Sequence, residues 1–148
     1  FDLVGASAET GLFDTIGHAD LVKKFGHRPT RPVSATYEAL AQRFARAGVC
    51  VEVNTAGLRK PVGEIYPHAD LLRACRAAGV PTTLGADAHA PGEVAADLGS
   101  GIALMRDVGY TEFAHYAARQ RTLVSLPNEK EGGAPAGTST PLSESSES

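Results

Sequence analysis

The chain has 148 residues, 43% hydrophobic and 21% charged, which suits one globular domain with a real core. No apolar run approaches the ~18 residues that span a bilayer, so a transmembrane helix is excluded. The net charge of −3 lies entirely in residues 128–148, which hold four of the 17 acids and one of the 14 bases. The balanced remainder gives no support for binding to nucleic acid or to an anionic membrane.

The first half of the chain alternates between predicted helices and strands. Residues 2–10 form a predicted helix that Gly11 ends, and residues 13–17 form a short strand. The clearest helix covers residues 34–47, where apolar residues recur at helical spacing. We expect Ser34 to cap its start and Gly48 to end it.

The second half continues the alternation and ends in a polar tail. The predicted elements are a buried strand over 49–53, a helix over 69–78, a strand over 81–84, short helices over 92–98 and 100–108, and a weak strand or helix near 113–117. Residues 128–148 are dominated by Ser, Gly, Thr, Pro and Glu, which predicts a disordered tail. A phosphorylated serine cluster is the functional alternative for this tail.

The order of the elements predicts an α/β fold with a parallel sheet. A closed α/β barrel needs about 250 residues, and only three strands are convincing here. We therefore expect residues 1–127 to be part of a barrel whose N-terminal portion precedes Phe1. Cys50 and Cys75 lie in apolar stretches, which indicates buried thiols in a reducing, cytoplasmic compartment. No signal peptide is visible.

Three polar clusters follow the three strands. They are Gly17–Asp20, Glu52–Thr55 and Gly85–His89. Because the carboxyl ends of parallel strands meet at one edge of a sheet, we expect these clusters to converge there.

Asp87 and His89 are the strongest metal-ligand candidates. At positions i and i+2 of an extended segment they face the same side, where a carboxylate and an imidazole can hold a metal ion. The alternative is a turn in which Asp87 caps the next helix. His18 is either a third ligand or a packed core residue, and Asp20 either orients it or caps a turn.

The other candidates point to an anionic small substrate. Glu52 is a buried carboxylate that needs a partner, catalytic or structural, and Asn54 either binds substrate or favours a turn. Arg59 lies in a long loop beside Lys60 and suits a phosphate, although it can also be a solvated base. A second basic loop holds Lys23, Lys24, His27, Arg28 and Arg31.

The segments GLFDTIGHADLVKKFGHRP, VEVNTAGLRKPVGEIYP and GVPTTLGADAH resemble, in this order, the carboxyl-terminal half of the histidinol-phosphatase family in the polymerase and histidinol phosphatase (PHP) superfamily. The resemblance covers about residues 9–117, and NTAGLRKPVGEIYP is its most specific part. It implies a distorted (β/α)7 barrel, related to the TIM barrel, with two or three divalent metal ions at its carboxyl face. The family's opening H-x-H motif and its other early ligands are absent from this chain.

By this resemblance, His18, Asp87 and His89 are metal ligands, and the metal is zinc, manganese or iron. Asp87, His89 and Arg59 would be catalytic. Substrate binding would fall to Arg59, Asn54, Glu52 and Lys24.

The implied reaction is hydrolysis of L-histidinol phosphate in histidine biosynthesis. The implied partners are a small phosphorylated substrate and the missing half of the barrel, with no nucleic acid or membrane. We expect this fragment alone to be inactive. The alternatives are another PHP phosphoesterase and a non-catalytic half-barrel that only binds.

Overall fold

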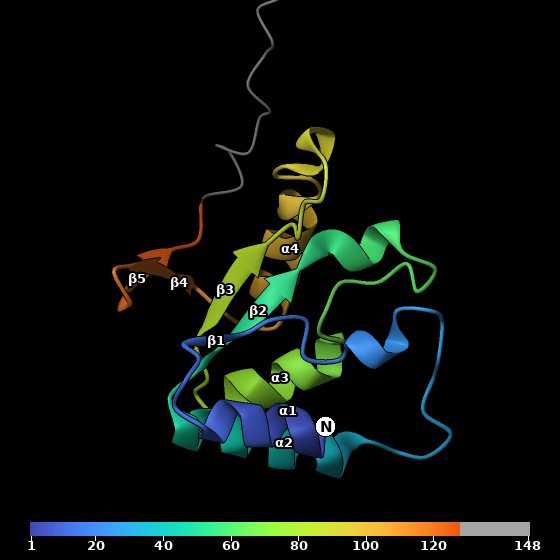
Figure 1. The fold of residues 1–148 in the computed structure, drawn as a ribbon, viewed down its shortest axis with the longest axis vertical. Coiled ribbons are helices and arrows are strands. Elements are labelled where there is room, and N and C mark those ends of the chain that lie inside the picture. Colours follow the sequence, from blue (N-terminus) through green and yellow to red (C-terminus); the bar gives the residue numbers. More distant parts are fainter. Residues whose placement is uncertain (128–148) are drawn as a thin grey trace, which may run out of the picture.

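The computed structural model describes residues 1–127 and centres them on a three-stranded parallel sheet (Figure 1). The strand order is β1 (Thr15–Ile16), β2 (Cys50–Asn54) and β3 (Thr82–Gly85). The expected α/β class with a parallel sheet is therefore confirmed, whereas the (β/α)7 barrel stays a prediction. The tail expected over 128–148 lies outside the described residues.

Three helices lie together on one side of the sheet (Figure 1). They are α1 (Asp2–Glu9), α2 (Ser34–Ala47) and α3 (Ala69–Ala77). Ser34 is the first residue of α2 and not its cap, because Tyr37 N already donates to Val33 O at 2.9 Å. Gly48 ends α2 as expected, at a φ of 70°. No helix of the described residues is long and apolar enough to cross a membrane.

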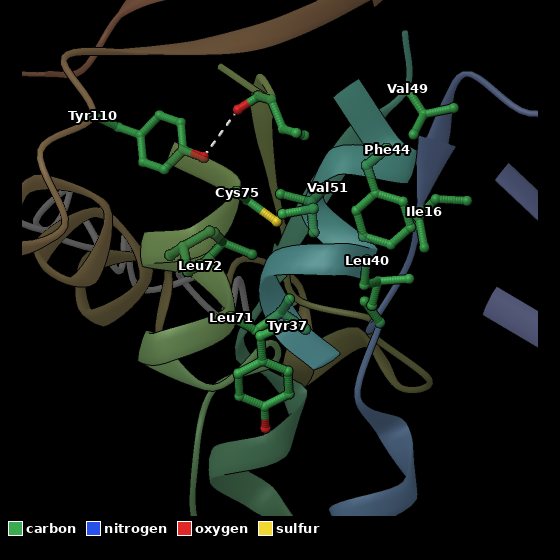
Figure 2. Packing of buried hydrophobic residues seen from close by; sticks show 14 of the residues in the cluster. Ile16, Tyr37, Leu40, Phe44, Val49, Val51, Leu71, Leu72, Cys75 and Tyr110 are labelled. Carbon is green, nitrogen blue, oxygen red and sulfur yellow. Dashed lines mark hydrogen bonds between the residues drawn. The ribbon is translucent and has the colours of Figure 1, made fainter. Parts of the chain in front are cut away.

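The core forms where α2 and α3 pack on the strands (Figure 2). Phe44 and Leu71 are fully buried and meet Val51 of the central strand in one cluster. Cys50 and Cys75 are buried free thiols, as expected. Burial raises the pKa of the Cys75 thiol to about 12, so it stays protonated and unreactive at neutral pH.

A short 3-10 helix follows each strand of the sheet. These helices are η1 (Leu21–Lys23) after β1, η2 (Thr55–Arg59) after β2 and η3 (Pro91–Glu93) after β3.

The segment after η3 differs from the sequence prediction. The helix expected over 92–98 is absent, because Ala95 and Asp97 have positive φ angles that a helix excludes. Helix α4 (Leu98–Asp107) begins only afterwards.

An antiparallel hairpin, β4 (Glu112–Ala117) and β5 (Gln120–Ser125), completes the described chain. The weak element near 113–117 is thus a strand. The hairpin is attached to the sheet by Thr83 Oγ1, which donates to Ala114 O at 3.0 Å, and by Tyr116 Oη, which donates to Asp14 O at 3.0 Å.

Candidate functional site at the carboxyl edge of the sheet

Glu52 on the central strand connects the ends of all three strands. Its Oε2 accepts a hydrogen bond from His18 N, just after β1, at 3.2 Å and another from Asn54 Nδ2 at 2.9 Å. On the β3 side, a Cβ built onto Gly85 would collide with Glu52 Oε1, so the carboxylate lies against the backbone of Gly85. The partly buried carboxylate therefore has hydrogen-bond partners within the fold, as its burial requires.

Asn54 also has partners within the fold. It is 1% exposed, and its Oδ1 accepts from Ala56 N at 3.0 Å, which caps η2. Asn54 and Glu52, which the sequence predicts as substrate-binding residues, thus hold the edge of the sheet in shape. The contact with Ala56 fits the predicted turn preference of Asn54. Substrate binding by Asn54 and Glu52 stays a prediction.

Two of the predicted metal ligands have unusual backbone angles. The φ of His18 is 28° and that of Asp87 is 48°, in a region that side chains other than glycine seldom adopt. Such angles persist only where neighbouring contacts impose them, and they are concentrated at functional sites. The hydrogen bond from His18 N to Glu52 is one such contact.

The side chains of the predicted ligands are not committed to other partners. Within residues 1–127, the Asp87 carboxylate and the His18 ring form no hydrogen bond or ion pair. His89 Nδ1 lies 2.8 Å from Asp87 O, which leaves Nε2 for another group. One carboxylate and two imidazoles are donors that suit a transition metal. However, the described residues contain no group of three or more His, Cys, Asp or Glu side chains arranged to hold a metal ion.

Arg59 fastens the loop that carries Asp87 and His89. Its Nη2 donates to Ala86 O at 2.6 Å, and its Nη1 donates to Asp97 Oδ2 at 3.4 Å. Glu93 lies 3.8 Å from Arg59 Nε, and its other oxygen accepts from His89 N at 2.8 Å. This backbone hydrogen bond from His89 and the nearby charge of Arg59 lower the pKa of Glu93. Both ends of the loop are therefore held from within the protein.

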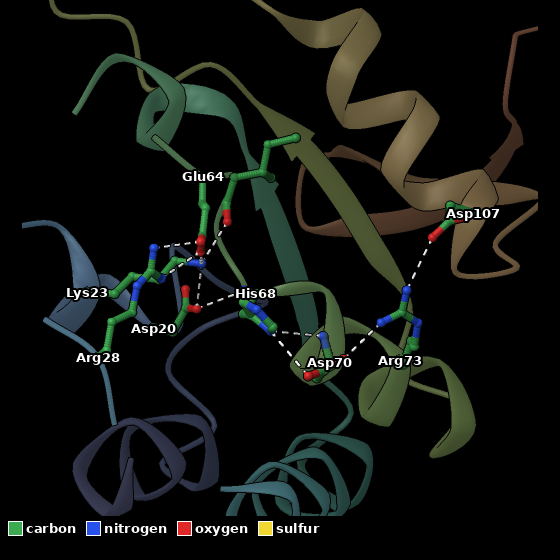
Figure 3. A network of polar contacts seen from close by, with 9 residues as sticks. Asp20, Lys23, Arg28, Glu64, His68, Asp70, Arg73 and Asp107 are labelled. Carbon is green, nitrogen blue, oxygen red and sulfur yellow. Dashed lines mark hydrogen bonds and ion pairs between the residues drawn. The ribbon is translucent and has the colours of Figure 1, made fainter. Parts of the chain in front are cut away.

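The basic loop after His18 is only partly free for a substrate. Lys23 is 6% exposed, and its Nζ lies 3.0 Å from Asp20 Oδ2 and 3.3 Å from Glu64 Oε2 (Figure 3). Arg28 pairs with the same Glu64 at 2.7 Å. Lys24, a predicted substrate-binding residue, places its ammonium 5.4 Å from the centre of the Phe25 ring.

Tyr66 is a residue that the sequence did not single out. It is 1% exposed, its ring lies edge-on to that of His18 at 6.4 Å, and its hydroxyl has no partner within the described residues. Burial, together with the charges of Asp20 and Asp87, raises the pKa of this hydroxyl. In the sequence, Tyr66 lies in the run IYP, shortly before α3. This position does not indicate that the Tyr66 ring contacts His18.

Comparison with known proteins gives one informative match. The chain is 48% identical over 109 residues to a protein of Deinococcus radiodurans named probable histidinol-phosphatase. The match covers 74% of this chain but only 41% of the relative, so the chain spans about two fifths of that relative's length. No family model matches the chain.

Proposed function

We propose that this chain provides part of the active site of a histidinol-phosphatase, which hydrolyses L-histidinol phosphate to L-histidinol and phosphate in histidine biosynthesis. The observation that carries the proposal is the 48% identity with the probable histidinol-phosphatase of Deinococcus radiodurans. The carboxyl edge of the sheet supports it, since Glu52 joins the segments of His18 and Gly85 there.

In this proposal His18, Asp87 and His89 hold divalent metal ions, with zinc, manganese and iron all compatible with the donors. Such ions, when bound, lower the pKa of a water and neutralise charge on the phosphate. The proposal requires further ligands from outside residues 1–127, because the three donors are not gathered into one cluster there.

The chain's own residues would hold these donors in place. Glu52 fixes the backbone of His18, and Arg59 fixes the backbone just before Asp87. Arg59 therefore has two candidate roles: it positions the loop, or it exchanges the weaker contact with Asp97 for a substrate phosphate. Lys24 remains a proposed helper on the phosphate.

The proposal is tested in the full-length protein that contains this chain. Phosphate release from L-histidinol phosphate is measured together with bound metal for Asp87→Ala and His89→Ala. Both quantities should fall together, by at least about tenfold in turnover. His115→Ala is the matched control, because His115 is exposed on β4 and should change neither. Full metal content and full turnover in Asp87→Ala would remove the metal assignment.

One observation favours a second candidate, a non-catalytic binding module. The described residues contain no group of three metal-type ligands. If the full-length protein releases no phosphate from L-histidinol phosphate under any of the three metals, the binding module becomes the better interpretation. Turnover of a different phosphomonoester alone would instead favour another phosphoesterase of the PHP superfamily.

A further inference from the structure

A cavity of about 360 Å³ lies beside the first turns of α2 and α3. Residues from four segments line it, among them Asp20, Tyr37, His68, Val33 and Pro29. Its volume falls at the lower end of the range for small-molecule sites. Much of its wall is apolar, but six of the eleven lining residues have acidic or basic side chains: Asp20, Lys23, His27, Arg28, His68 and Asp70. Asp87, His89 and Arg59 do not line it, so it is separate from the loop after β3.

Asp20, which lines this cavity, has an unsatisfied acceptor. Its carboxylate is 3% exposed, and its Oδ2 accepts from His68 N at 2.7 Å and from Lys23 at 3.0 Å. Its Oδ1 is buried and has no hydrogen-bond partner within the described residues. Leaving a buried carboxylate oxygen unpaired is costly, so a donor supplied by a ligand would be stabilised there.

The nearby cations are already used (Figure 3). Lys23 Nζ contacts Asp20, Glu64 and, at 2.9 Å, Ile65 O, which accounts for its three N–H groups. Arg28 contacts both oxygens of Glu64, at 2.9 and 2.7 Å. Lys23 therefore has no donor left for an anionic ligand, whereas Arg28 is paired with Glu64 and keeps three of its five N–H groups. The backbone N–H of His68, the N-cap residue of α3, is also taken by Asp20.

The walls suit an organic cation. The rings of Phe1 and Tyr37 meet edge to face at 5.6 Å and both line the cavity. Aromatic faces attract ammonium groups. Burial raises the pKa of Tyr37, and the charges of Asp20, Asp70 and Glu64 add to the shift.

We propose that this cavity binds a small molecule that carries an amino group on an apolar body, with one N–H donated to Asp20 Oδ1. The inference does not depend on the proposed phosphatase activity, because Asp20, Val33 and Tyr37 are neither proposed metal ligands nor proposed phosphate contacts.

The test titrates the full chain with phenethylamine and with two probes of the same shape, phenethyl alcohol and 3-phenylpropionate, followed by NMR. We expect saturable shifts of Tyr37 and His68 signals with the amine and an affinity at least about tenfold above that of either other probe. Equal or tighter binding of 3-phenylpropionate would overturn the proposal, and so would amine-induced shifts that avoid the cavity residues.

Two variants separate the carboxylate from the cavity itself. Asp20→Asn keeps the shape and should abolish the preference for the amine. Because Asp20→Asn also weakens the contact with Lys23 and can impair folding, Val33→Phe provides a second test: it fills the cavity, leaves Asp20 intact and should lower binding of the amine. Glu38→Gln, on an exposed position of α2, is the matched control. Unchanged amine binding in Val33→Phe would contradict the site.

Discussion

Arg59 makes its shortest contact with a backbone oxygen and not with another charge. The guanidinium donates to the carbonyl oxygen of Ala86 at 2.6 Å, and Ala86 directly precedes Asp87. Loss of the guanidinium should therefore loosen the loop that carries Asp87 and His89. We expect Arg59→Ala in the full-length protein to lower bound metal together with kcat/KM, by about ten- to a hundredfold for a lost charge-assisted contact. Lys should rescue little, because an ammonium cannot span both Ala86 and Asp97. Full metal content with a raised KM would instead assign Arg59 to the phosphate.

Glu64 makes part of the stability dependent on pH. The hydrogen bond from Arg28 lowers its pKa first, and Lys23 adds to the effect. A carboxyl whose folded pKa lies below its ordinary value stabilises the fold above that value, and the stabilisation is lost as pH falls through the folded pKa. Urea unfolding at pH 7 and at about pH 3.5 should therefore show a smaller loss in Glu64→Gln than in the unaltered chain. Because Glu64 is 35% exposed, salt should reduce the difference. Equal losses in both proteins would show that this carboxyl does not contribute.

The candidate ligands could be predicted from the sequence because each follows a strand. The contacts that fix their backbone could not be predicted. The partners of Arg59, Ala86 and Asp97, lie 27 and 38 residues further along the chain. They reach Arg59 through a loop in which Asp87 and Asp97 have positive φ angles, and the sequence pattern does not predict these angles. The ion pair of Lys23 with Asp20 could be predicted, because the two residues are three positions apart. The ion pair of Lys23 with Glu64 could not, because the two lie far apart in the sequence.

At the scale of elements, η2 depends on a close approach at Gly57. A Cβ there would overlap Glu64 O and press on the ring of Tyr66. Because a backbone oxygen cannot move aside cheaply, Gly57→Ala should cost about 3 kcal/mol or more in the free energy of unfolding. Gly92→Ala, with nothing within 4 Å of its Cβ, should stay within about 0.5 kcal/mol. Denaturant unfolding of both variants measures the contrast, and similar stabilities would mean that η2 can shift as a whole.

The elements that the sequence predicted well are those with one buried face. Helix α2 buries Tyr37, Leu40, Ala41 and Phe44, and this spacing is readable as a pattern. Every residue of β5 is exposed, so no alternation reveals that strand. Its turn uses Ala118 and Arg119 at positive φ, where a sequence reader looks for Gly or Asn. The hairpin was missed for these two reasons.

At the scale of the molecule, an apolar face lies beside β1. Leu3 is 86% exposed, Val22 70% and Phe13 50%, and all three line a groove of about 510 Å³ between α1 and β1. Within the described residues, β1 pairs with β2 alone, so its other edge carries unpaired backbone groups. Exposed apolar patches and open strand edges both favour association.

We therefore expect the 148-residue chain, expressed by itself, to associate in solution and to bind the dye ANS. Gel filtration and dye fluorescence over a concentration series measure both effects. Leu3→Glu together with Val22→Lys should reduce them, because the two substitutions place charges on the face without touching the core. Leu123→Glu is the control, since Leu123 is 53% exposed on the hairpin, away from this face.

We also expect no turnover of L-histidinol phosphate by this chain alone, because its three proposed ligands do not form a cluster. A monomer that unfolds cooperatively, binds no dye and releases phosphate would show that these 148 residues are sufficient for both fold and site.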